Sequence, residues 1–426
     1  MTNEHQSHGE SPTVADLRLP PSFVTEHLIR SLSYQGAMSV VDLARHLHVH
    51  PDIVAQVAEP LKAAGLLESE SSRTNFEALN KIRLSSAGQA RVAAARNRTW
   101  YAGPLPVSLE ELEARIGQIG FTVERVALEH NLAPFFFDAH VLAEIGQAVS
   151  AASSVCMVGL ACDEQQAFIA AVKGALSGVA SVPYAVFAAG NVIRTLDPRV
   201  HVAPSEPGDD VRRERGSRTR WASVGRPAVT VSGGVLRTDI QPAYDEEARF
   251  YLAPAPFSAF GGVLGFCDAH QSDREVLRDL ARLWLAPGRY GTGVLLLRSG
   301  ERIEVPWRAA TFVMSETEDV VAALNASVGY VIDARAIAGR PLQAFLTQRL
   351  PNGGAFPEVA TSRLAGLLAG ADLATRTAAA QAARYLRDLR TYTGDSFAVS
   401  DEALRAAVQH AANAVRQPRR SMDLAA

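Results

Sequence analysis

The chain has 426 residues, of which 47% are hydrophobic and 20% charged, and its formal net charge is -3. This length allows two or three domains, each with a real core, and the composition is that of a soluble globular protein. No apolar run is long enough to cross a bilayer, and the small net charge excludes bulk attraction to nucleic acid or to anionic membranes. Three cysteines do not make a disulfide framework. The polar N-terminus is unlike a signal peptide, which favours a cytoplasmic location.

The first hundred residues predict a tail and a compact helical unit. Residues 1–20 are polar and lack periodicity, which predicts a disordered tail. Residues 21–99 predict three helices, of which the second is capped by Ser39 and the third opens at Pro51. Residues 66–68 and 81–84 could then pair as a two-stranded wing before a fourth helix. Three helices followed by a hairpin are the arrangement of a winged helix-turn-helix domain.

The charge of the third helix bears on whether this domain reads DNA. It offers Asp52, Glu59 and a single Lys62. A recognition helix must neutralise phosphates and present Arg, Asn or Gln to the base edges. The sequence therefore favours a winged helix that binds protein over one that binds DNA.

The middle of the chain predicts a parallel sheet. Residues 100–150 are predicted as a helical linker, with helices near 108–119 and 138–149. Residues 151–335 then alternate short apolar strands with helices, which indicates an α/β core with a parallel sheet covered by helices. The strands are expected at Val155–Val158, Ala228–Val231, Val263–Phe266, Thr311–Met314 and Tyr330–Ile332. A hairpin of Val294–Arg298 with Arg302–Val305 is inserted before the fourth strand.

The remaining segments predict one loop and a helical C-terminal part. Residues 204–222 read as a solvated surface loop, with contact to an acidic partner or to nucleic acid as the alternative. This loop carries Arg212, Arg213, Arg215, Arg218 and Arg220. Residues 336–395 are Ala-rich and predict a helical lid. Residues 396–426 predict a last helix near 400–416 and a basic tail.

Residues 155–172 have the outline of a phosphate-binding loop without its chemistry. An apolar strand runs into Gly159, and a short turn leads to a helix. The pattern G-x-x-x-x-G-K-[ST] would require Gly, Lys and a hydroxyl where this chain has Glu164, Gln165 and Gln166. The nearest lysine, Lys173, lies roughly 12 Å further along the helix at 1.5 Å per residue. It cannot reach a phosphate bound at the loop.

The order and spacing of several further motifs resemble a known family between about residues 20 and 335. These motifs are Leu19–Phe23, Arg98–Pro104, Val182–Ala185, Leu196–Pro198 with Val200 and His201, Ala248–Tyr251 and Gly261–Val263. Together they resemble bacterial AAA+ ATPases of the "ATPase with chaperone activity" type, which carry a winged helix before the ATPase module. The resemblance implies a P-loop NTPase core with a helical lid.

The resemblance also implies that the reaction has been lost. In the family, the positions of Glu164, Gln165 and Gln166 bind the phosphates and magnesium. Cys267 replaces the magnesium-side acid, and Asp268 alone stands where the water-activating acid would be. Glu316 stands in place of the asparagine that senses the γ-phosphate. The arginines that reach a neighbouring subunit would fall near Ala326 and Ser327.

The expected function follows from these replacements. Phosphoryl transfer depends mainly on positioned positive charge, which magnesium and lysine supply. The expectation is a catalytically inactive structural or regulatory subunit, with no catalytic residue, no metal and no cofactor. Its partners would be copies of itself or an active AAA+ paralogue, and other proteins through the winged helix and the arginine loop. A nucleotide sensor or weak ATPase and a DNA-binding regulator are the alternatives. The vestigial ATP or ADP pocket would comprise Gly159, Gln165, Gln166, Asp268 and the lid residue Arg376.

Two further hypotheses concern the same loop. Asp163 and Glu164 sit at a helix N-terminus, where their carboxylates could fill the anion site that a phosphate normally takes. Cys162 and Cys267, with Asp268 and His270 nearby, could form a metal site or a redox pair. Small buried thiols that fill space are the commoner case.

Overall fold

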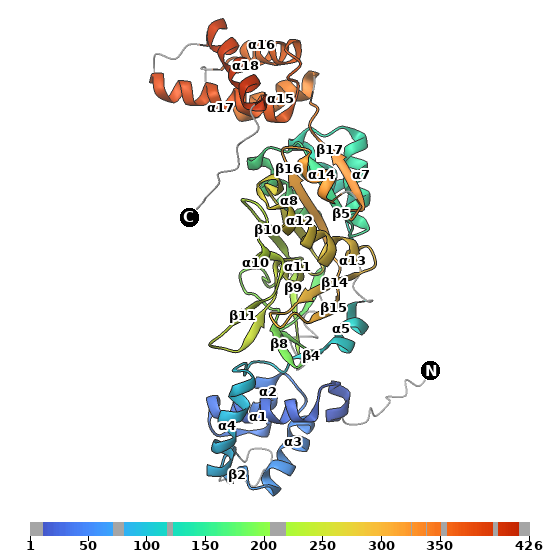
Figure 1. Ribbon diagram of the computed structural model, residues 1–426, viewed down its shortest axis with the longest axis vertical. Helices are drawn as coiled ribbons and strands as arrows, with labels where there is room; N and C mark the ends of the chain where they lie inside the picture. The colour runs from blue at the N-terminus through green and yellow to red at the C-terminus, as the bar shows by residue number, and fades with distance from the viewer. Residues whose placement is uncertain are drawn as a thin grey trace, which may run out of the picture.

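The computed structural model describes residues 12–70, 81–116, 122–204, 219–324, 326–337, 339–350, 356–394 and 399–416. The molecule is elongated, with an N-terminal helical unit at one end, an α/β part in the middle and a helical domain at the other end (Figure 1). None of the helices in the described ranges is long and apolar enough to cross a membrane.

The N-terminal unit contains the predicted helices and hairpin. Its elements are η1 (Val14–Leu17), α1 (Pro21–Gln35), β1 (Met38–Ser39), α2 (Val40–Leu47), α3 (Pro51–Ala63), β2 (Leu67–Glu70), β3 (Lys81–Leu84) and α4 (Ser86–Arg98). The Ser39 hydroxyl accepts a hydrogen bond from the Asp42 amide and so caps α2. Strands β2 and β3 pair antiparallel, with Leu67 opposite Leu84, and β1 adds to the free side of β3.

The central parallel sheet lies where the sequence predicted it. Its strands are β5 (Ser154–Val158), β10 (Ala228–Val231), β13 (Val263–Phe266), β16 (Ala310–Ser315) and β17 (Tyr330–Asp333). Their order in the sheet is β10-β13-β16-β5-β17, and every pairing is parallel. The predicted fold class, a parallel sheet covered by helices, is confirmed.

Both faces of the sheet are buried at its central strands β5, β13 and β16, which explains their continuous apolar sequences. On one face Val155 and Met157 pack with α6 (Arg125–Leu132), α7 (Ala139–Ser150) and α8 (Cys162–Gly174). On the other face Cys156 and Val313 pack with α12 (Arg274–Leu280) and α14 (Asp319–Leu324). Alternate residues of one strand therefore serve two separate cores.

A second five-stranded sheet was not predicted. Its strands are β4 (Val107–Ser108), β7 (Ala185–Ala188), β8 (Asn191–Arg194), β11 (Ala243–Asp245) and β12 (Phe250–Leu252), in the order β11-β12-β8-β7-β4. Strands β6 (Val179–Pro183) and β9 (Trp221–Gly225) form a separate antiparallel pair. The hairpin of β14 (Thr292–Leu296) and β15 (Arg302–Pro306) is present, but its first strand ends before Arg298.

The segment 100–150 differs from the predicted linker because both of its halves pack into the α/β part. Val107 pairs with Val186 of the second sheet, and α5 (Leu109–Ile116) follows. Helices α6 and α7, joined by η3 (Ala133–Phe135), cover the parallel sheet. Helix α6 was not predicted.

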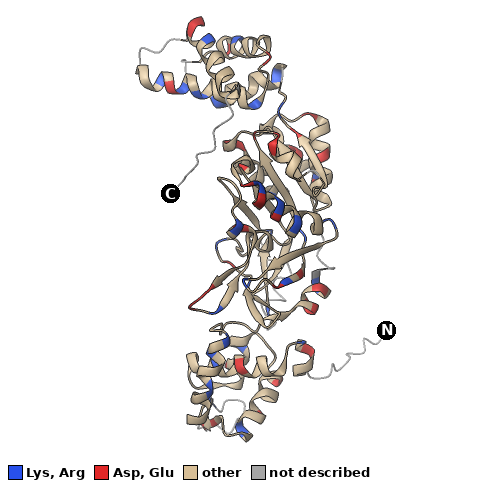
Figure 2. Ribbon diagram, viewed as in Figure 1, with Lys and Arg blue, Asp and Glu red and all other residues tan. Residues whose placement is uncertain are grey.

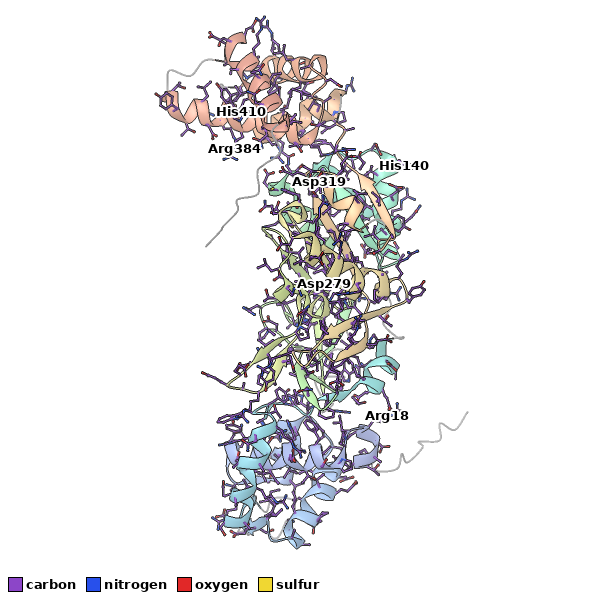
Figure 3. The ribbon with its side chains drawn as sticks, viewed as in Figure 1. Arg18, His140, Asp279, Asp319, Arg384 and His410 are labelled. Atoms are coloured by element: carbon purple, nitrogen blue, oxygen red, sulfur yellow. The ribbon has the colours of Figure 1, made fainter. Side chains whose placement is uncertain are left out.

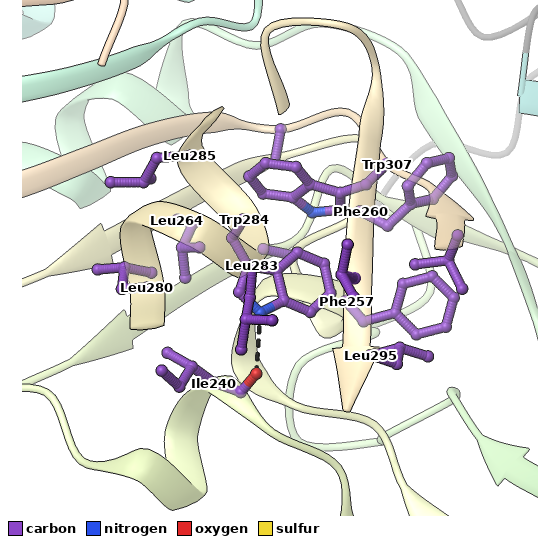
Figure 4. Close-up of a cluster of buried hydrophobic side chains, with 14 of the residues drawn as sticks. Ile240, Phe257, Phe260, Leu264, Leu280, Leu283, Trp284, Leu285, Leu295 and Trp307 are labelled. Carbon is purple, nitrogen blue, oxygen red and sulfur yellow. Dashed lines mark hydrogen bonds between the residues drawn. The ribbon is translucent and has the colours of Figure 1, made fainter. Parts of the chain in front are cut away.

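A tryptophan pair anchors the largest core. Trp284 and Trp307 meet at 5.3 Å between ring centroids, and the indole N–H of Trp284 donates to the Ile240 carbonyl at 2.8 Å (Figure 4). A Cβ added at Gly293 would lie 2.4 Å from the Trp284 ring, so this position requires glycine. The remaining short elements around this core are α10 (Arg237–Ile240), α11 (Ala255–Ser258), η4 (Ala269–Gln271), the π-helical turn η5 (Ala281–Leu285) and α13 (Ala286–Gly288).

The C-terminal domain is a bundle of helices α15 (Gly339–Arg349), α16 (Glu358–Gly370), α17 (Arg376–Thr393) and α18 (Asp401–Arg416). Leucine and alanine side chains from all four helices form one core. Arg384 and His410, labelled in Figure 3, mark α17 and α18, and the His410 ring lies 5.1 Å from that of Tyr385. Basic and acidic residues are interspersed over the whole molecule (Figure 2).

Candidate functional site

The candidate site lies at the carboxyl edge of the parallel sheet, where β5 runs between β16 and β17. Ligands of open α/β sheets bind at this edge, at the point where the strand order reverses. The loop after β5 meets the residues that follow β13 and β16, so Cys267, Asp268 and Glu316 all lie near α8. Gly159 opens the loop with φ +99°, and a Cβ there would lie 2.5 Å from Arg335. Only glycine fits this close approach.

The loop itself is short. Helix α8 begins at Cys162, so three residues separate it from β5. Glu164, Gln165 and Gln166 consequently lie within the first turns of the helix. A phosphate cradle needs consecutive free amides in a longer loop. The exposed Lys173 lies near the other end of α8.

Two carboxylates cover the N-terminal amides of α8. The Ala161 amide donates to Glu164 Oε2 at 3.1 Å, and the Cys162 amide donates to Glu316 Oε1 at 3.1 Å. The positive end of the helix dipole therefore faces negative charge supplied by the protein. Asp163 was also expected in this role, but it points to Arg349 instead. Glu316 takes the place expected for Asp163.

Two arginines of the C-terminal domain reach Glu164, and one of them also reaches Asp163. Arg349, at the end of α15, pairs with Asp163 and lies 3.4 Å from Glu164. Arg376, at the start of α17, lies 3.7 Å from Glu164. Arg376 was a predicted site residue and Arg349 was not. No local motif marks Arg349, because its partners lie more than 180 residues earlier in the chain.

Arg376 is almost fully buried, with 1% of its side chain exposed. Its guanidinium donates to the Ala334 carbonyl at 2.8 Å and to the Phe136 carbonyl at 3.2 Å. It also lies over the Phe137 ring, 4.9 Å from the centroid. Arg376 thus connects three parts of the core, which are the end of β17, the segment that precedes α7, and helix α8.

Burial shifts the pKa of both members of this ion pair. Burial raises the pKa of Glu164, and the opposing effect of Arg349 and Arg376 is smaller. Burial lowers the pKa of Arg376, and Glu164 partly offsets that shift. Desolvation therefore outweighs the attraction between the two charges, as is common for buried ion pairs.

Gln165 bridges the helix to the end of β13. Its side chain is fully buried, with its amide group donating to the Leu160 carbonyl at 3.0 Å and its oxygen accepting from the Asp268 amide at 2.8 Å. Asp268 adopts the left-handed conformation at φ 56° and accepts a bond from the Gly233 amide at 3.3 Å. Gln166 turns away and donates to Ser232 at 2.8 Å. Of the predicted pocket residues, Gln165 and Asp268 therefore bond to each other, while Gln166 bonds to Ser232 and Arg376 pairs with Glu164.

The cysteines are free thiols. Burial raises the pKa of Cys162, and Asp268 and Glu316 raise it further. Burial raises the pKa of Cys267 to about 11. Thiols with raised pKa values are poor nucleophiles and poor metal ligands. Within the described ranges, no three His, Cys, Asp or Glu residues are grouped to hold a metal ion.

The predicted arginine loop is only partly described. Residues 205–218 lie outside the described residues, and with them Arg212, Arg213, Arg215 and Arg218. The Arg220 side chain is only 10% exposed and pairs with Glu111, and it donates to the Pro106 carbonyl at 2.8 Å. Its assignment to a solvated or partner-binding loop is therefore wrong, because its charge is used inside the fold.

The chain matches no protein-family model and no curated protein. Among solved structures, a chain of the complex between subunits BchI and BchD of magnesium chelatase is similar at 15% identity and a TM-score of 0.31, covering 64% of this chain and 91% of that one. NtrX from Brucella abortus is similar at 11% identity and a TM-score of 0.28, covering 66% of this chain and 70% of that one. Both TM-scores are low, so any function must be inferred from the residues of the site.

Proposed function

We propose that this chain is a non-hydrolysing relative of the AAA+ ATPases that acts as a structural or regulatory subunit of an assembly. The observation that carries the proposal is the filled N-terminus of α8. Glu164 and Glu316 accept from the amides at the start of this helix, where a phosphate would accept in a working P-loop. A bound nucleotide would have to displace both carboxylates.

The chemistry of the site supports the absence of hydrolysis. Phosphoryl transfer needs positive charge on the β- and γ-phosphates, from a lysine and a metal ion. At the lysine position Gln165 is neutral and fully buried, and its amide nitrogen and oxygen each make a hydrogen bond within the protein. A phosphate about 4 Å from the Glu164 carboxylate would be repelled by roughly 4 kcal/mol at an effective dielectric of about 20. Neither transition-state stabilisation nor tight ground-state binding is expected.

The N-terminal unit supports a protein partner over DNA. The single cation of α3, Lys62, is paired with Glu59 at 2.8 Å. Gln56, an amide that could read a base edge, bonds instead to the Pro12 carbonyl and the Val14 amide. Helix α3 thus lacks the groups that contact phosphate and base.

An exposed aromatic patch on the same unit is the proposed contact surface. The Arg96 guanidinium lies over the Tyr34 ring at 4.7 Å and over the Trp100 ring at 5.2 Å. Both rings are more than 40% exposed. Arg, Tyr and Trp are the residues enriched at energetic centres of protein interfaces.

A nucleotide sensor without hydrolysis is the second candidate. Arg376 is retained beside the loop, and its Nη1 atom has no hydrogen-bond partner among the described residues. An anion that displaced Glu164 would find this nitrogen ready to donate.

The test combines nucleotide response with assembly. The full-length protein should show no ATP hydrolysis and no change in melting temperature with ATP or ADP and magnesium. Sedimentation should show a concentration-dependent oligomer, or a complex with an added active AAA+ protein encoded beside it. Turnover that disappears in a Gln165→Ala variant would refute the proposal. A protein that stays monomeric and hydrolytically silent with every candidate partner would refute the subunit role.

A further inference from the structure

We infer that the helical domain α15–α18 is fastened to the α/β core by a ligand-independent clamp, in which Arg349 and Arg376 grip the carboxylates of α8. The clamp occupies the position at which an anionic ligand would otherwise bridge the helical domain and the α/β core. The inference rests on the proposed function in one respect only, namely that the start of α8 holds no phosphate.

Arg349 forms the outer half of the clamp. It is the last residue of α15, and its side chain is 14% exposed although it reaches across to a different part of the molecule. It contacts Asp163 and Glu164 together, and its guanidinium also lies over the Phe345 ring at 4.6 Å. Two adjacent carboxylates thus bind one guanidinium, which holds the end of α15 against the start of α8.

Arg376 forms the inner half and also marks the hinge. Its backbone amide donates to the Arg335 carbonyl at 3.0 Å, and the Ile337 amide donates to the Ala374 carbonyl at 3.1 Å. These backbone bonds attach the helical domain to the end of β17 independently of Glu164. The domain is therefore attached at two places. The first is this pair of backbone bonds, which we call the hinge. The second is the Arg349 side chain at the other end of α15, which we call the latch.

The latch is electrostatic and partly exposed, which makes it breakable without unfolding either part. Asp163 is 63% exposed, so salt screens its share of the attraction. The core of the helical bundle consists mainly of its own leucine and alanine residues, with Phe136 of the α/β part packed against it, and does not include the Arg349 side chain. When the Arg349 contacts are lost, the helical domain should remain attached at the hinge but move more freely relative to the α/β core.

The test is hydrogen–deuterium exchange on the full-length protein. Arg349→Gln should speed exchange of the amides at the start of α8 and in α15 by roughly two- to fivefold, as expected for a partly exposed ion pair. Exchange in α1–α4 should not change. Arg363→Gln is the matched control, because Arg363 is also an arginine of the helical domain but pairs with Asp401 inside that domain.

A conservative variant separates a clamp from a general loss of stability. Arg349→Lys keeps a positive charge beside Asp163 and Glu164 and should leave exchange at the start of α8 close to that of the wild type. Raised salt should speed exchange in the wild type and have little effect in Arg349→Gln. Unchanged exchange in Arg349→Gln, or exchange in Arg349→Lys as fast as in Arg349→Gln, would overturn the clamp.

Nucleotide binding is followed in the same samples with ATP and magnesium. No binding together with unchanged exchange in Arg349→Gln refutes the clamp and leaves the proposed function standing. ATP binding by the wild type refutes the proposal that no phosphate binds at the start of α8. If exchange still rises in Arg349→Gln in that case, the clamp survives on its own evidence.

Discussion

Glu164 and Arg376 meet at 3.7 Å across the boundary between the α/β core and the helical domain. Both side chains are more than 90% buried, and neither has an oppositely charged partner in its own helix. A second arginine, Arg349, shares the same carboxylate from α15. The charge of Glu164 is therefore balanced by arginines of the protein itself, which distinguishes the site from a pocket that has merely lost its catalytic residues.

Removal of the Glu164 carboxylate should destabilise the protein. Glu164→Ala would leave Arg376 buried without its counter-charge, and breaking a buried pair in this way typically removes about 3 kcal/mol or more of unfolding free energy. Asp163→Ala is the control, because that carboxylate is largely exposed and such pairs contribute about 0–1 kcal/mol. Urea titration of both variants measures the difference. Equal losses would show that Glu164 is not specially placed.

Gln165 should be needed for the fold although no chemistry depends on it. Gln165→Leu keeps the size of the side chain but leaves the Leu160 carbonyl and the Asp268 amide without a partner. Each unsatisfied group typically lowers stability by about 1–3 kcal/mol. Gln166→Leu removes a bond between exposed side chains and should have little effect. Calorimetric melting of the two variants distinguishes them, and equal melting temperatures would contradict this role.

Gly159 should tolerate no side chain. Gly159→Ala would add the strain of a positive φ and a clash with Arg335 at 2.5 Å. Gly190→Ala is the control, because Gly190 also has a positive φ (+75°) but has open space around its Cβ. Strain alone is expected to reduce stability by about 1 kcal/mol, and the clash should add to that. A smaller loss at Gly159 than at Gly190 would mean that the loop can move away from Arg335.

The stability of the N-terminal unit should fall in acid because of His27. Its Nε2 lies 2.8 Å from the Gly103 carbonyl and its Nδ1 lies 3.2 Å from Arg30, so the neutral ring donates to the carbonyl and accepts from the guanidinium. Burial, reinforced by Arg30, lowers the pKa of His27 from 6.5 to about 3. Protonation would set two cationic donors against each other.

The direction of this pH dependence follows from linkage, because the pKa of His27 is lower in the folded state than in the unfolded state. The contribution of His27 is fully present above pH 6.5 and is lost as the pH falls from there toward 3. Between pH 7 and pH 5 the unfolding free energy of the wild type should drop by about 2 kcal/mol more than that of His27→Gln. Urea titrations at both values measure this difference. Parallel pH profiles would show that His27 takes up its proton in the folded state at the same pH as in the unfolded state.

The parallel sheet could be predicted because each of its strands is a short run of mostly apolar residues, and the three central strands are buried on both faces. The second sheet could not, because strands such as Val107–Ser108 have two to four residues and depend on partners far along the chain. Likewise the loss of the lysine at Gln165 is visible in the sequence. The salt bridges of Arg349 and the capping by Glu316 are not, since both join residues more than 150 positions apart.

Equilibrium titration of the full-length protein with ATP and with ADP, in the presence of magnesium, tests the central claim most directly. Calorimetry should detect no binding heat up to millimolar ligand, because Glu164 and Glu316 already occupy the anion position at α8. The variant with Gly, Lys and Thr at positions 164–166 should melt at a lower temperature, since it loses the capping carboxylate. Saturable binding of ATP by the wild type in the micromolar range would contradict the claim and show that this site still accepts a nucleotide.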